Sequence, residues 1–374
     1  MIIAIPKENF NNESRVSCPP SSVKELIKNG YEVHFETGCG LASSISDDDY
    51  KSVGAKLMKD NSTLYQESDI ILRVNYPSLD EIKLLKRDST IISFFQSTGS
   101  LKEVQALKDK NITGFSMHLV PRTTLAQKMD ALSSQANIAG YKSVLMAASR
   151  LGIYMPLLMT AAGTIRPAKV LILGAGVAGL QAIATAKRLG AQVEVFDVRP
   201  VVKEQVESLG ARFIELPEVE EKPGEAGGYA KAVTPEFLSK QKATLTKYLS
   251  EADVAICTAQ VLGKKAPVLI DSPMIEKMRP GAVVIDLAVA QGGNCEGTKA
   301  NETIIKDGVK LIGAGELPSS VPYDASSLYA KNLTSLITPF IKDGLIKLDK
   351  EDELISGCLL SDEGVVLQNK VFEN

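Results

Sequence analysis

The chain has 374 residues and a mass of 40.1 kDa, enough for two or three domains with a large buried core. Hydrophobic residues make up 44% of it, charged residues 23%, and the net charge is -3, a composition that excludes a disordered, collagen-like or coiled-coil protein. This weak acidity provides no basic face for nucleic acid. Five scattered cysteines and two histidines indicate neither a disulfide framework nor a zinc site nor a histidine-based triad, and they fit a reducing compartment.

The N-terminus and the longest apolar stretch predict neither export nor membrane insertion. The first residues, MIIAIPKENF, contain no basic region followed by a small-residue cleavage site, so we expect no signal peptide. The apolar stretch 144–162 is broken by Arg150, Gly152 and Pro156, and Arg150 would have to lie near the middle of a bilayer. We therefore expect no transmembrane helix, and membrane contact only through a partner.

Short apolar runs predict buried parallel strands. In chain order they are 2–5, 32–35, 70–74, 90–95, 170–173, 193–196, 254–257, 283–287 and 309–312. Helical spacing between these runs predicts helices, among them 23–29, 101–109, 180–189 and 203–209. Strands that alternate with helices are typical of βαβ units. The predicted fold class is therefore α/β, with two doubly wound parallel-sheet domains, a cleft between them and long connecting helices.

Two long helical segments interrupt this alternation and predict the domain boundaries. Segment 129–151 has only Gly140 as an interior breaker and is too long for a crossover between adjacent strands, so we expect it to bridge two domains. A second crossing is expected at the helical run 325–341, which has a capping signal at Asp324. The predicted domains are residues 1–132 together with 322–374, and an inserted nucleotide-binding domain at 133–321.

The strongest local signal is KVLILGAGVAGL at 169–180. A buried strand precedes its glycines, a helix follows them, and Asp197 closes the next strand 18 residues after Gly179. Glycines in this pattern permit a tight turn, close approach of backbone N–H groups to a pyrophosphate, and close packing of the helix. A glycine-rich turn without a ligand is the weaker alternative. The predicted dinucleotide contacts are Gly174, Ala175, Gly176, Val177, Ala178 and Gly179.

The acid at the end of the second strand favours NAD over NADP. Asp197 would accept hydrogen bonds from the ribose hydroxyls and repel a 2′-phosphate. Arg199 lies two residues further on and could host such a phosphate, so the preference for NAD stays open on this point. We expect Asp197, Val198 and Arg199 to line the adenosine ribose.

Polar residues at the entry to the bridging helix form a second candidate site. Their 3,3,4 spacing predicts one helical face, and Arg122 stands just ahead of it. The residues of this face are Gln127, Asp130, Ser133 and Asn137. A solvated face that caps the helix explains the pattern equally well from sequence alone.

Two further segments carry ligand-binding signals. Paired glycines before Tyr229, in the loop 225–231, predict a lid over a bound ligand, although an ordinary surface loop is equally consistent. The segments 258–260 and 286–294 follow predicted strands. Because ligands of open α/β sheets lie beyond the carboxyl ends of the strands, we expect both to face the cofactor, with Thr258 and Ala259 as contacts.

Together these motifs resemble the alanine dehydrogenase/transhydrogenase family, whose domains are Rossmann-like. Within it they resemble the soluble NAD(H)-binding part of the alpha subunit of Re/Si-specific, proton-translocating NAD(P) transhydrogenase. The resemblance covers nearly the whole chain and rests on GAGVAGL, FDVR at 196–199, KEQVESLG at 203–210, the loop 225–231, APVLI at 266–270, KMRPG at 277–281, DLA at 286–288 and GGNC at 292–295.

Chemistry separates the two branches of this family. Alanine dehydrogenase needs a lysine and a histidine for its proton transfers, and the matching positions here hold Asn75 and Gln96. Hydride transfer between two nicotinamide rings needs no general base, only close, oriented rings and excluded solvent. The missing pair therefore predicts transhydrogenation. The family's usual acid before Gly-Gly-Asn is also absent, replaced by Ala290-Gln291, which leaves the local hydrogen bonding open.

The resemblance also implies roles and partners. Arg122, Gln127, Asp130 and Ser133 would hold the nicotinamide carboxamide and the nearby ribose as catalytic residues, and Tyr229 would close on the nucleotide. NADH would bind to this chain and NADP(H) to a beta subunit, with no metal. The chain ends at Asn374 without membrane helices, which resembles the split-gene form. This resemblance implies a cytoplasmic homodimer that is attached to the inner membrane through the beta subunit and a membrane-spanning alpha segment.

Two other functions stay open at this stage. One is an alanine dehydrogenase with a relocated acid-base pair. The other is a non-catalytic NAD-sensing module whose segment 122–133 contacts a protein.

Overall fold

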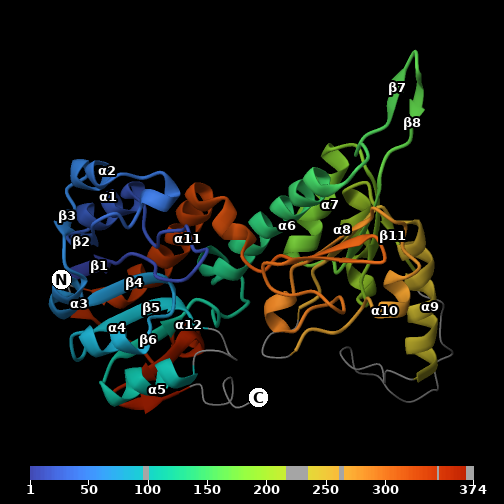
Figure 1. The fold of residues 1–374 in the computed structure, drawn as a ribbon. Coiled ribbons are helices and arrows are strands. Elements are labelled where there is room, and N and C mark those ends of the chain that lie inside the picture. The colour runs from blue at the N-terminus through green and yellow to red at the C-terminus, as the bar shows by residue number, and fades with distance from the viewer. Residues whose placement is uncertain (96–100, 216–234, 261–264, 343–344, 368–374) are drawn as a thin grey trace. The chain divides into compact units, whose positions relative to one another are not determined.

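The computed structural model describes residues 1–95, 101–215, 235–260, 265–342 and 345–367 (Figure 1). The chain divides into two compact units. Unit 1 comprises Met1–Ala136 and Pro318–Asn374, and unit 2 comprises Asn137–Leu317. The sequence pattern predicts the inserted domain at 133–321. In the structure, as in the sequence prediction, the C-terminal part of the chain belongs to the same unit as the N-terminal part.

Unit 1 is built on an eight-stranded sheet with the order β19-β18-β6-β5-β4-β1-β2-β3. Its strands are β1 (Ile2–Ile5), β2 (Glu32–Glu36), β3 (Lys56–Met58), β4 (Ile70–Asn75), β5 (Thr90–Phe94), β6 (Thr113–Ser116), β18 (Leu359–Asp362) and β19 (Val365–Val366). Strands β1 to β6 run parallel, which confirms the predicted α/β class. The returning strand β18 pairs antiparallel with β6, a feature that the sequence did not predict.

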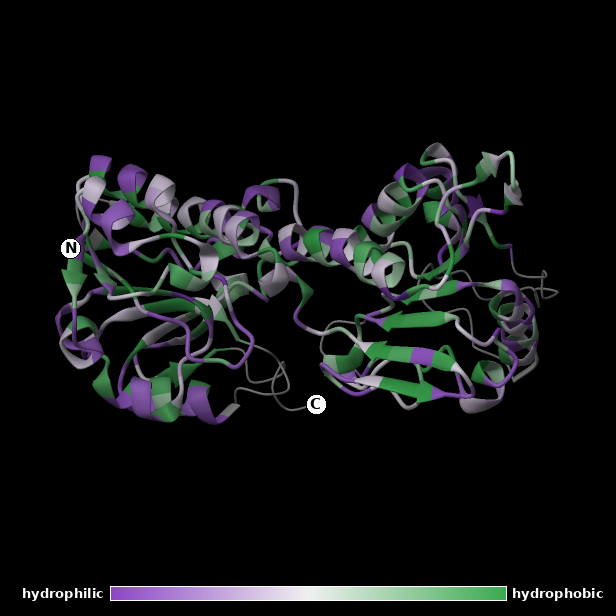
Figure 2. Cartoon of the chain, turned by 45° about the horizontal axis from the view of Figure 1, so that its top comes forward, coloured by the Kyte–Doolittle hydropathy of each residue, from purple (hydrophilic) through white to green (hydrophobic). Residues whose placement is uncertain are grey.

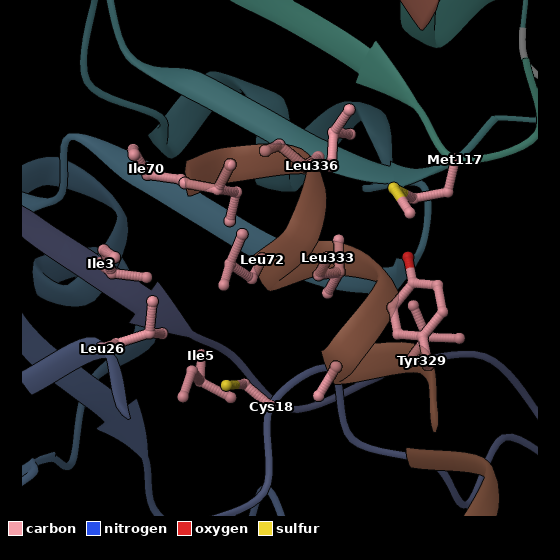
Figure 3. Packing of buried hydrophobic residues seen from close by; sticks show 14 of the residues in the cluster. Ile3, Ile5, Cys18, Leu26, Ile70, Leu72, Met117, Tyr329, Leu333 and Leu336 are labelled. Carbon is pink, nitrogen blue, oxygen red and sulfur yellow. The ribbon is translucent and has the colours of Figure 1, made fainter. Parts of the chain in front are cut away.

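Helices cover both faces of this sheet (Figure 1). They are α1 (Pro20–Lys28), α2 (Asp47–Ser52), α3 (Asn61–Glu67), α4 (Leu79–Leu84), α5 (Leu101–Asp109), α11 (Pro322–Ile337) and α12 (Glu353–Cys358). One core lies between α1, α11 and the sheet, and a second lies between α3, α4, α5 and its other face. Figure 3 shows Leu333 and Leu336 of α11 packed near Ile70 and Leu72 of β4. Burial of these apolar side chains holds the C-terminal helix on the N-terminal sheet.

The start and end of α11 differ from the sequence prediction. The helix begins at Pro322 with Val321 as its N-cap, so the predicted cap at Asp324 is wrong. Proline suits the first helical position because its fixed φ is already helical, and Asp324 in the first turn is favoured by the helix dipole instead. The helix ends at Ile337 rather than 341, two residues before Pro339, which lacks the N–H needed to continue it.

Unit 2 contains a seven-stranded sheet with the order β11-β10-β9-β12-β13-β15-β14. Its strands are β9 (Lys169–Leu173), β10 (Gln192–Phe196), β11 (Arg212–Phe213), β12 (Val254–Cys257), β13 (Val283–Asp286), β14 (Thr303–Lys306) and β15 (Val309–Gly313). They are parallel except that β14 runs antiparallel to β15. The chain order reverses between β9 and β12, and ligands of such sheets bind beyond the carboxyl ends of the strands at this point.

The helices of unit 2 sandwich its hydrophobic sheet, whose strands are largely green in Figure 2. The helices are α7 (Val177–Arg188), α8 (Lys203–Ser208), α9 (Pro235–Glu251) and α10 (Ser272–Ile275). Helices α7 and α8 pack on one face and α9 and α10 on the other. The long helix α6 (Ala131–Arg150) crosses the boundary between the units, and within unit 2 its Gly140 allows close contact with α7, since a Cβ there would lie 2.1 Å from Ala178 O.

A two-stranded hairpin, β7 (Leu158–Thr160) and β8 (Gly163–Ile165), projects from unit 2 (Figure 1). Its second leg is anchored to the sheet by Arg166, which donates two hydrogen bonds to Asp253 at 2.7 and 2.8 Å. From sequence this region was interpreted only as part of an apolar stretch. A smaller hairpin, β16 (Ile341–Lys342) and β17 (Leu345–Ile346), lies in unit 1. Among the described residues, no helix is both long and apolar enough to cross a bilayer.

Candidate nucleotide-binding site

The glycine-rich turn joins β9 to α7 at the switch point of the unit 2 sheet. Gly174 has φ +106°, and a Cβ there would lie 2.6 Å from Thr258 Oγ1. A Cβ on Gly179 would lie 1.9 Å from Gly174 O, so the packing of the turn excludes a side chain at both positions. Gly176 is the N-cap of α7, and a Cβ there would have no neighbour within 4 Å. The turn thus leaves open space at the N-terminus of α7, the kind of place where backbone N–H groups can bind phosphate groups.

Asp197 follows β10, and its side chain is only 6% exposed. Its carboxylate accepts hydrogen bonds from the backbone N–H of Ala175 at 2.7 Å and from Arg199. Burial raises the pKa of Asp197, but the hydrogen bonds from Arg199 and Ala175 outweigh it and hold the pKa below its usual value. The carboxylate is therefore charged at neutral pH, and both of its oxygens act only as hydrogen-bond acceptors. Val198 beside it is 63% exposed.

The loop after β12 packs directly against the glycine-rich turn. Thr258 Oγ1 donates to Gly174 O at 3.0 Å. Ala259 is held by the buried side chain of Asn294, whose Oδ1 accepts from Ala259 N at 3.1 Å and whose Nδ2 donates to Ala259 O at 2.9 Å. The structure thus brings Thr258 and Ala259 to the same place as the glycines, at the carboxyl ends of adjacent strands.

Asp286, at the end of β13, organises the turn that carries Asn294. It is fully buried and accepts hydrogen bonds from the backbone N–H groups of Ala288, Asn294 and Cys295 and from Thr298 Oγ1, at 2.9 to 3.0 Å. From sequence this segment was expected only to face the cofactor. The sequence signal for the supporting role of Asp286 is its position: it ends a buried strand and precedes the paired glycines Gly292 and Gly293.

The polar segment of unit 1 does not form the single helical face that its spacing predicted. Gln127 lies in a separate 3-10 turn, Gln127–Met129, and α6 begins only at Ala131. Asp130 accepts hydrogen bonds from Ser133 N at 2.9 Å and Ser133 Oγ at 2.5 Å, so it caps the helix. The 3-residue spacing therefore arises here from a capping arrangement. Asn137 is further along α6, within unit 2.

Asn332 on α11 fixes this segment, and its role was not predicted from sequence. Its Nδ2 donates to Lys128 O and its Oδ1 accepts from Ser134 Oγ, both at 2.8 Å. One sequence signal could have indicated this role: Asn332 is an amide residue among the apolar positions of a helix. Arg122 is exposed at the start of the segment, and its charge adds to burial in lowering the pKa of nearby His118.

Two predicted positions, Tyr229 and Gln96, lie outside the described residues. Within the described ranges, no group of three or more histidine, cysteine, aspartate or glutamate side chains is placed to hold a metal ion. The open glycine turn, the helix N-terminus and the charged Asp197 together fit NAD.

Comparison with known proteins identifies the family. Models of the alanine dehydrogenase/PNT N-terminal and C-terminal domains match residues 4–139 and 143–369. The chain belongs to the alanine dehydrogenase/PNT family. This confirms the resemblance found in the sequence and places the chain among NAD-binding oxidoreductases with Rossmann-like domains.

Members of the alanine dehydrogenase/PNT family resemble this chain to different degrees. A Rhodospirillum rubrum protein, named as the first part of NAD(P) transhydrogenase subunit alpha, is 44% identical over 98% of each chain. A solved transhydrogenase structure from Sinorhizobium meliloti has a TM-score of 0.86 and 38% identity, covering 98% of this chain and 99% of that one. A solved L-alanine dehydrogenase structure has a TM-score of 0.82 but only 25% identity, covering 99% and 98%. Both share the fold, and the sequence is more similar to the transhydrogenases.

Asn75, which the resemblance matches to the lysine of alanine dehydrogenase, belongs to an internal polar cluster in unit 1. Asn75 donates from Nδ2 to Glu13 Oε2 at 2.8 Å. Arg15 donates two hydrogen bonds to Glu13, from Nε at 2.8 Å and from Nη2 at 2.6 Å. The Nη1 of Arg15 donates to Gln135 Oε1 at 2.8 Å. Burial raises the pKa of Glu13, but its bonds with Arg15 outweigh this and lower it. These side chains therefore satisfy one another's charge and hydrogen bonds.

Proposed function

We propose that this chain is the NAD(H)-binding component of a proton-translocating transhydrogenase. In this proposal a hydride passes directly between NADH on this chain and NADP+ on a partner subunit. The observation that carries it is the unit 1 cluster, in which Asn75 replaces a proton-handling lysine and binds Glu13. The open glycine turn of unit 2 and the similarity to transhydrogenase alpha subunits support it.

Each candidate site residue has a binding or orienting role in this reaction. Bound NADH would supply the hydride from C4 of its nicotinamide. The glycine turn and the N-terminus of α7 hold the pyrophosphate, and Asp197 holds the adenosine ribose. In unit 1 the proposed residues for orienting the nicotinamide and excluding water are Arg122, Gln127, Asp130 and Ser133. Because no proton leaves the substrate, none of them has to act as a general base.

The proposal includes partner subunits. NADP(H) would bind to a beta subunit, and proton translocation would run through that subunit and a membrane-spanning alpha segment. The chain would then work on the cytoplasmic face of the inner membrane, attached only through these partners. The Rhodospirillum rubrum relative is named as one part of a subunit alpha, and this supports an assembly of several chains.

We also propose that the chain is a homodimer and that the β7–β8 hairpin contributes to its interface. The hairpin exposes large apolar side chains, with Leu157 54%, Met159 73% and Ile165 40% exposed, and Figure 2 shows it mainly green and white. Such a patch is typical of a surface that another protein covers. The hydrogen bonds from Arg166 to Asp253 attach the base of the hairpin to unit 2.

Replacing Met159 with aspartate is expected to weaken the dimer by about 30-fold or more, since a buried charge at an interface centre costs about 2 kcal/mol or more. Analytical ultracentrifugation over a concentration series measures the change. Ile305→Asp is the matched control, because Ile305 is also exposed (70%) but lies on the edge strand β14 of the same unit. A dimer that withstands Met159→Asp would exclude the hairpin from the interface.

Replacing Asp197 with asparagine is expected to weaken NADH binding by about 1.5 to 3 kcal/mol, or roughly 10- to 150-fold, because charged hydrogen bonds to the ribose are lost. NADH fluorescence measures the affinity without interference, since the chain contains no tryptophan. The wild-type affinity should stay constant from pH 6 to 8, because the lowered pKa of Asp197 keeps it ionised there. Asp324→Asn, in unit 1, is the control. Unchanged affinity in Asp197→Asn would remove this residue from the ribose site.

An assay of the purified chain tests the alanine dehydrogenase alternative. We expect no turnover with alanine and NAD+, or with pyruvate, ammonia and NADH. Rapid turnover of these substrates without a partner would overturn the proposed function. The NAD-sensing alternative is tested by variants of Asp130, which should lose hydride transfer only if the segment 122–133 belongs to the site.

A further inference from the structure

The carboxylate of Asp197 is saturated with hydrogen bonds from its own chain. Oδ2 accepts from Ala175 N at 2.7 Å and from a terminal nitrogen of Arg199 at 2.9 Å. Oδ1 accepts from Arg199 N and from Arg199 Nε, both at 2.9 Å. A carboxylate offers about four lone-pair positions. These four donors therefore use the positions that a ligand would need.

The four donors differ in how firmly they are held. Two are backbone N–H groups, from Ala175 and Arg199, whose positions are set by the glycine turn and by the bend after β10. The other two belong to the guanidinium of Arg199, which presents one N–H to each carboxylate oxygen. The adjacent hydroxyls of a ribose also present one O–H to each oxygen of a carboxylate. The guanidinium and the ribose diol thus require the same pair of acceptor positions.

We propose that Arg199 is a specificity-determining residue that competes with the adenosine ribose for Asp197. Its guanidinium occupies the two acceptor positions that the ribose diol needs, and it would have to leave the carboxylate when NADH binds. The inference rests on the proposed function in one respect, because it takes NADH as the ligand of this site.

Two features limit the cost of displacing the guanidinium. The Arg199 side chain is 50% exposed, so its charge remains solvated after it leaves the carboxylate. The Asp197 side chain is only 6% exposed, so its bonds to the guanidinium must be replaced, and the two ribose hydroxyls supply one donor to each carboxylate oxygen. The backbone N–H of Arg199 can stay on Oδ1 while the side chain rotates away. The exchange therefore requires no rearrangement of the glycine turn.

The same arginine has the opposite effect on NADP(H). A 2′-phosphate would place a second negative charge beside Asp197, which repels it. The Arg199 guanidinium reduces this repulsion, since its positive charge lies next to the carboxylate and can also pair with a phosphate. Removal of the guanidinium should therefore favour NADH and disfavour NADPH at the same time.

Arg199→Met tests this inference, because methionine keeps an unbranched side chain and removes the charge and the donors. Dissociation constants of NADH and NADPH are measured by nucleotide fluorescence on the full chain. We expect the Kd of NADH to fall about two- to fivefold and the Kd of NADPH to rise. Arg199→Lys, which retains the charge but not the two-donor fork, should bind NADPH more tightly than Arg199→Met does.

Arg212→Met is the matched control. Arg212 is 71% exposed in the same unit and contacts Glu194 at 3.4 Å, so this variant changes the net charge equally without touching Asp197. A rise in the Kd of NADH for Arg199→Met, or no change for either nucleotide, would overturn the inference while leaving the proposed function in place. Failure of the wild-type chain to bind NADH would instead overturn both.

Discussion

Replacing Asp130 with alanine is expected to lower the rate of hydride transfer from NADH to NADP+ by about 100-fold, the loss that a misplacement of about 1 Å produces. Asp130 connects the segment 122–129 to the first turn of α6, because its carboxylate accepts from both Ser133 N and Ser133 Oγ. Without it, the segment that carries Arg122 and Gln127 loses its fixed attachment to the helix. The affinity for NADH should change little, since the glycine turn and Asp197 remain intact.

Stopped-flow measurement of transfer in the presence of the NADP-binding component tests this prediction. Loss of a helix cap also destabilises the fold by about 0.5 to 2 kcal/mol, so the control must remove a cap elsewhere. Asp60→Ala does this, because Asp60 caps α3 in the same unit by accepting from Ser62 N and Thr63 N. The variant Asp130→Asn distinguishes the loss of the charge from the loss of the cap, because asparagine can still cap the helix but is uncharged. Wild-type transfer in Asp130→Ala would exclude the segment from the site and favour a sensing module.

Replacing Asp286 with alanine is expected to lower the free energy of unfolding of unit 2 by about 3 kcal/mol or more, because each buried donor left without a partner costs about 1 to 3 kcal/mol. Three backbone N–H groups lose their acceptor in this variant, whereas the Thr298 hydroxyl can still donate to Cys295 O at 2.8 Å. The loosened turn carries Asn294, which holds Ala259 beside the glycine turn. NADH binding should weaken as well, although Asp286 would not contact the nucleotide.

Urea denaturation combined with hydrogen exchange of unit 2 peptides measures this loss. Asp271→Ala is the matched control in the same unit. Asp271 caps the short helix α10 by accepting from Met274 N at 3.2 Å, and its loss should cost about 1 kcal/mol. Equal destabilisation by the two variants would show that the buried hydrogen bonds of Asp286 contribute no more than the partly buried cap at Asp271.

Local patterns were sufficient to predict the central strands and the glycine turn. The run 254–257 appears as β12, and 101–109 appears as α5, because buried parallel strands and amphipathic helices leave distinct periodicities. The glycine motif was informative because its requirements are local, as the contact between Gly179 and Gly174 shows. The strands β14 (Thr303–Lys306) and β18 (Leu359–Asp362) were missed, since polar residues leave each of them only two consecutive apolar residues.

Residues whose partners are far apart in the chain could not be predicted. Arg15 and Gln135 are separated by 120 residues, and Asn332 reaches Lys128 across 204. No local pattern encodes such pairs, because tertiary folding alone brings them together. The spacing of Asp130 and Ser133 was ambiguous for a different reason. A helix cap and a helical face place polar residues at the same interval of three.

The most direct test of the central claim follows the hydrogen atom itself. NADH deuterated at both C4 positions is mixed with this chain, a separate NADP-binding transhydrogenase component and NADP+, and the NADPH formed is analysed by mass spectrometry. Direct transfer predicts that every NADPH carries one deuterium, and that unlabelled NADH in D2O yields NADPH without deuterium. Loss of the label in H2O, or uptake of deuterium from D2O, would show that a proton-handling group takes part and would contradict the account.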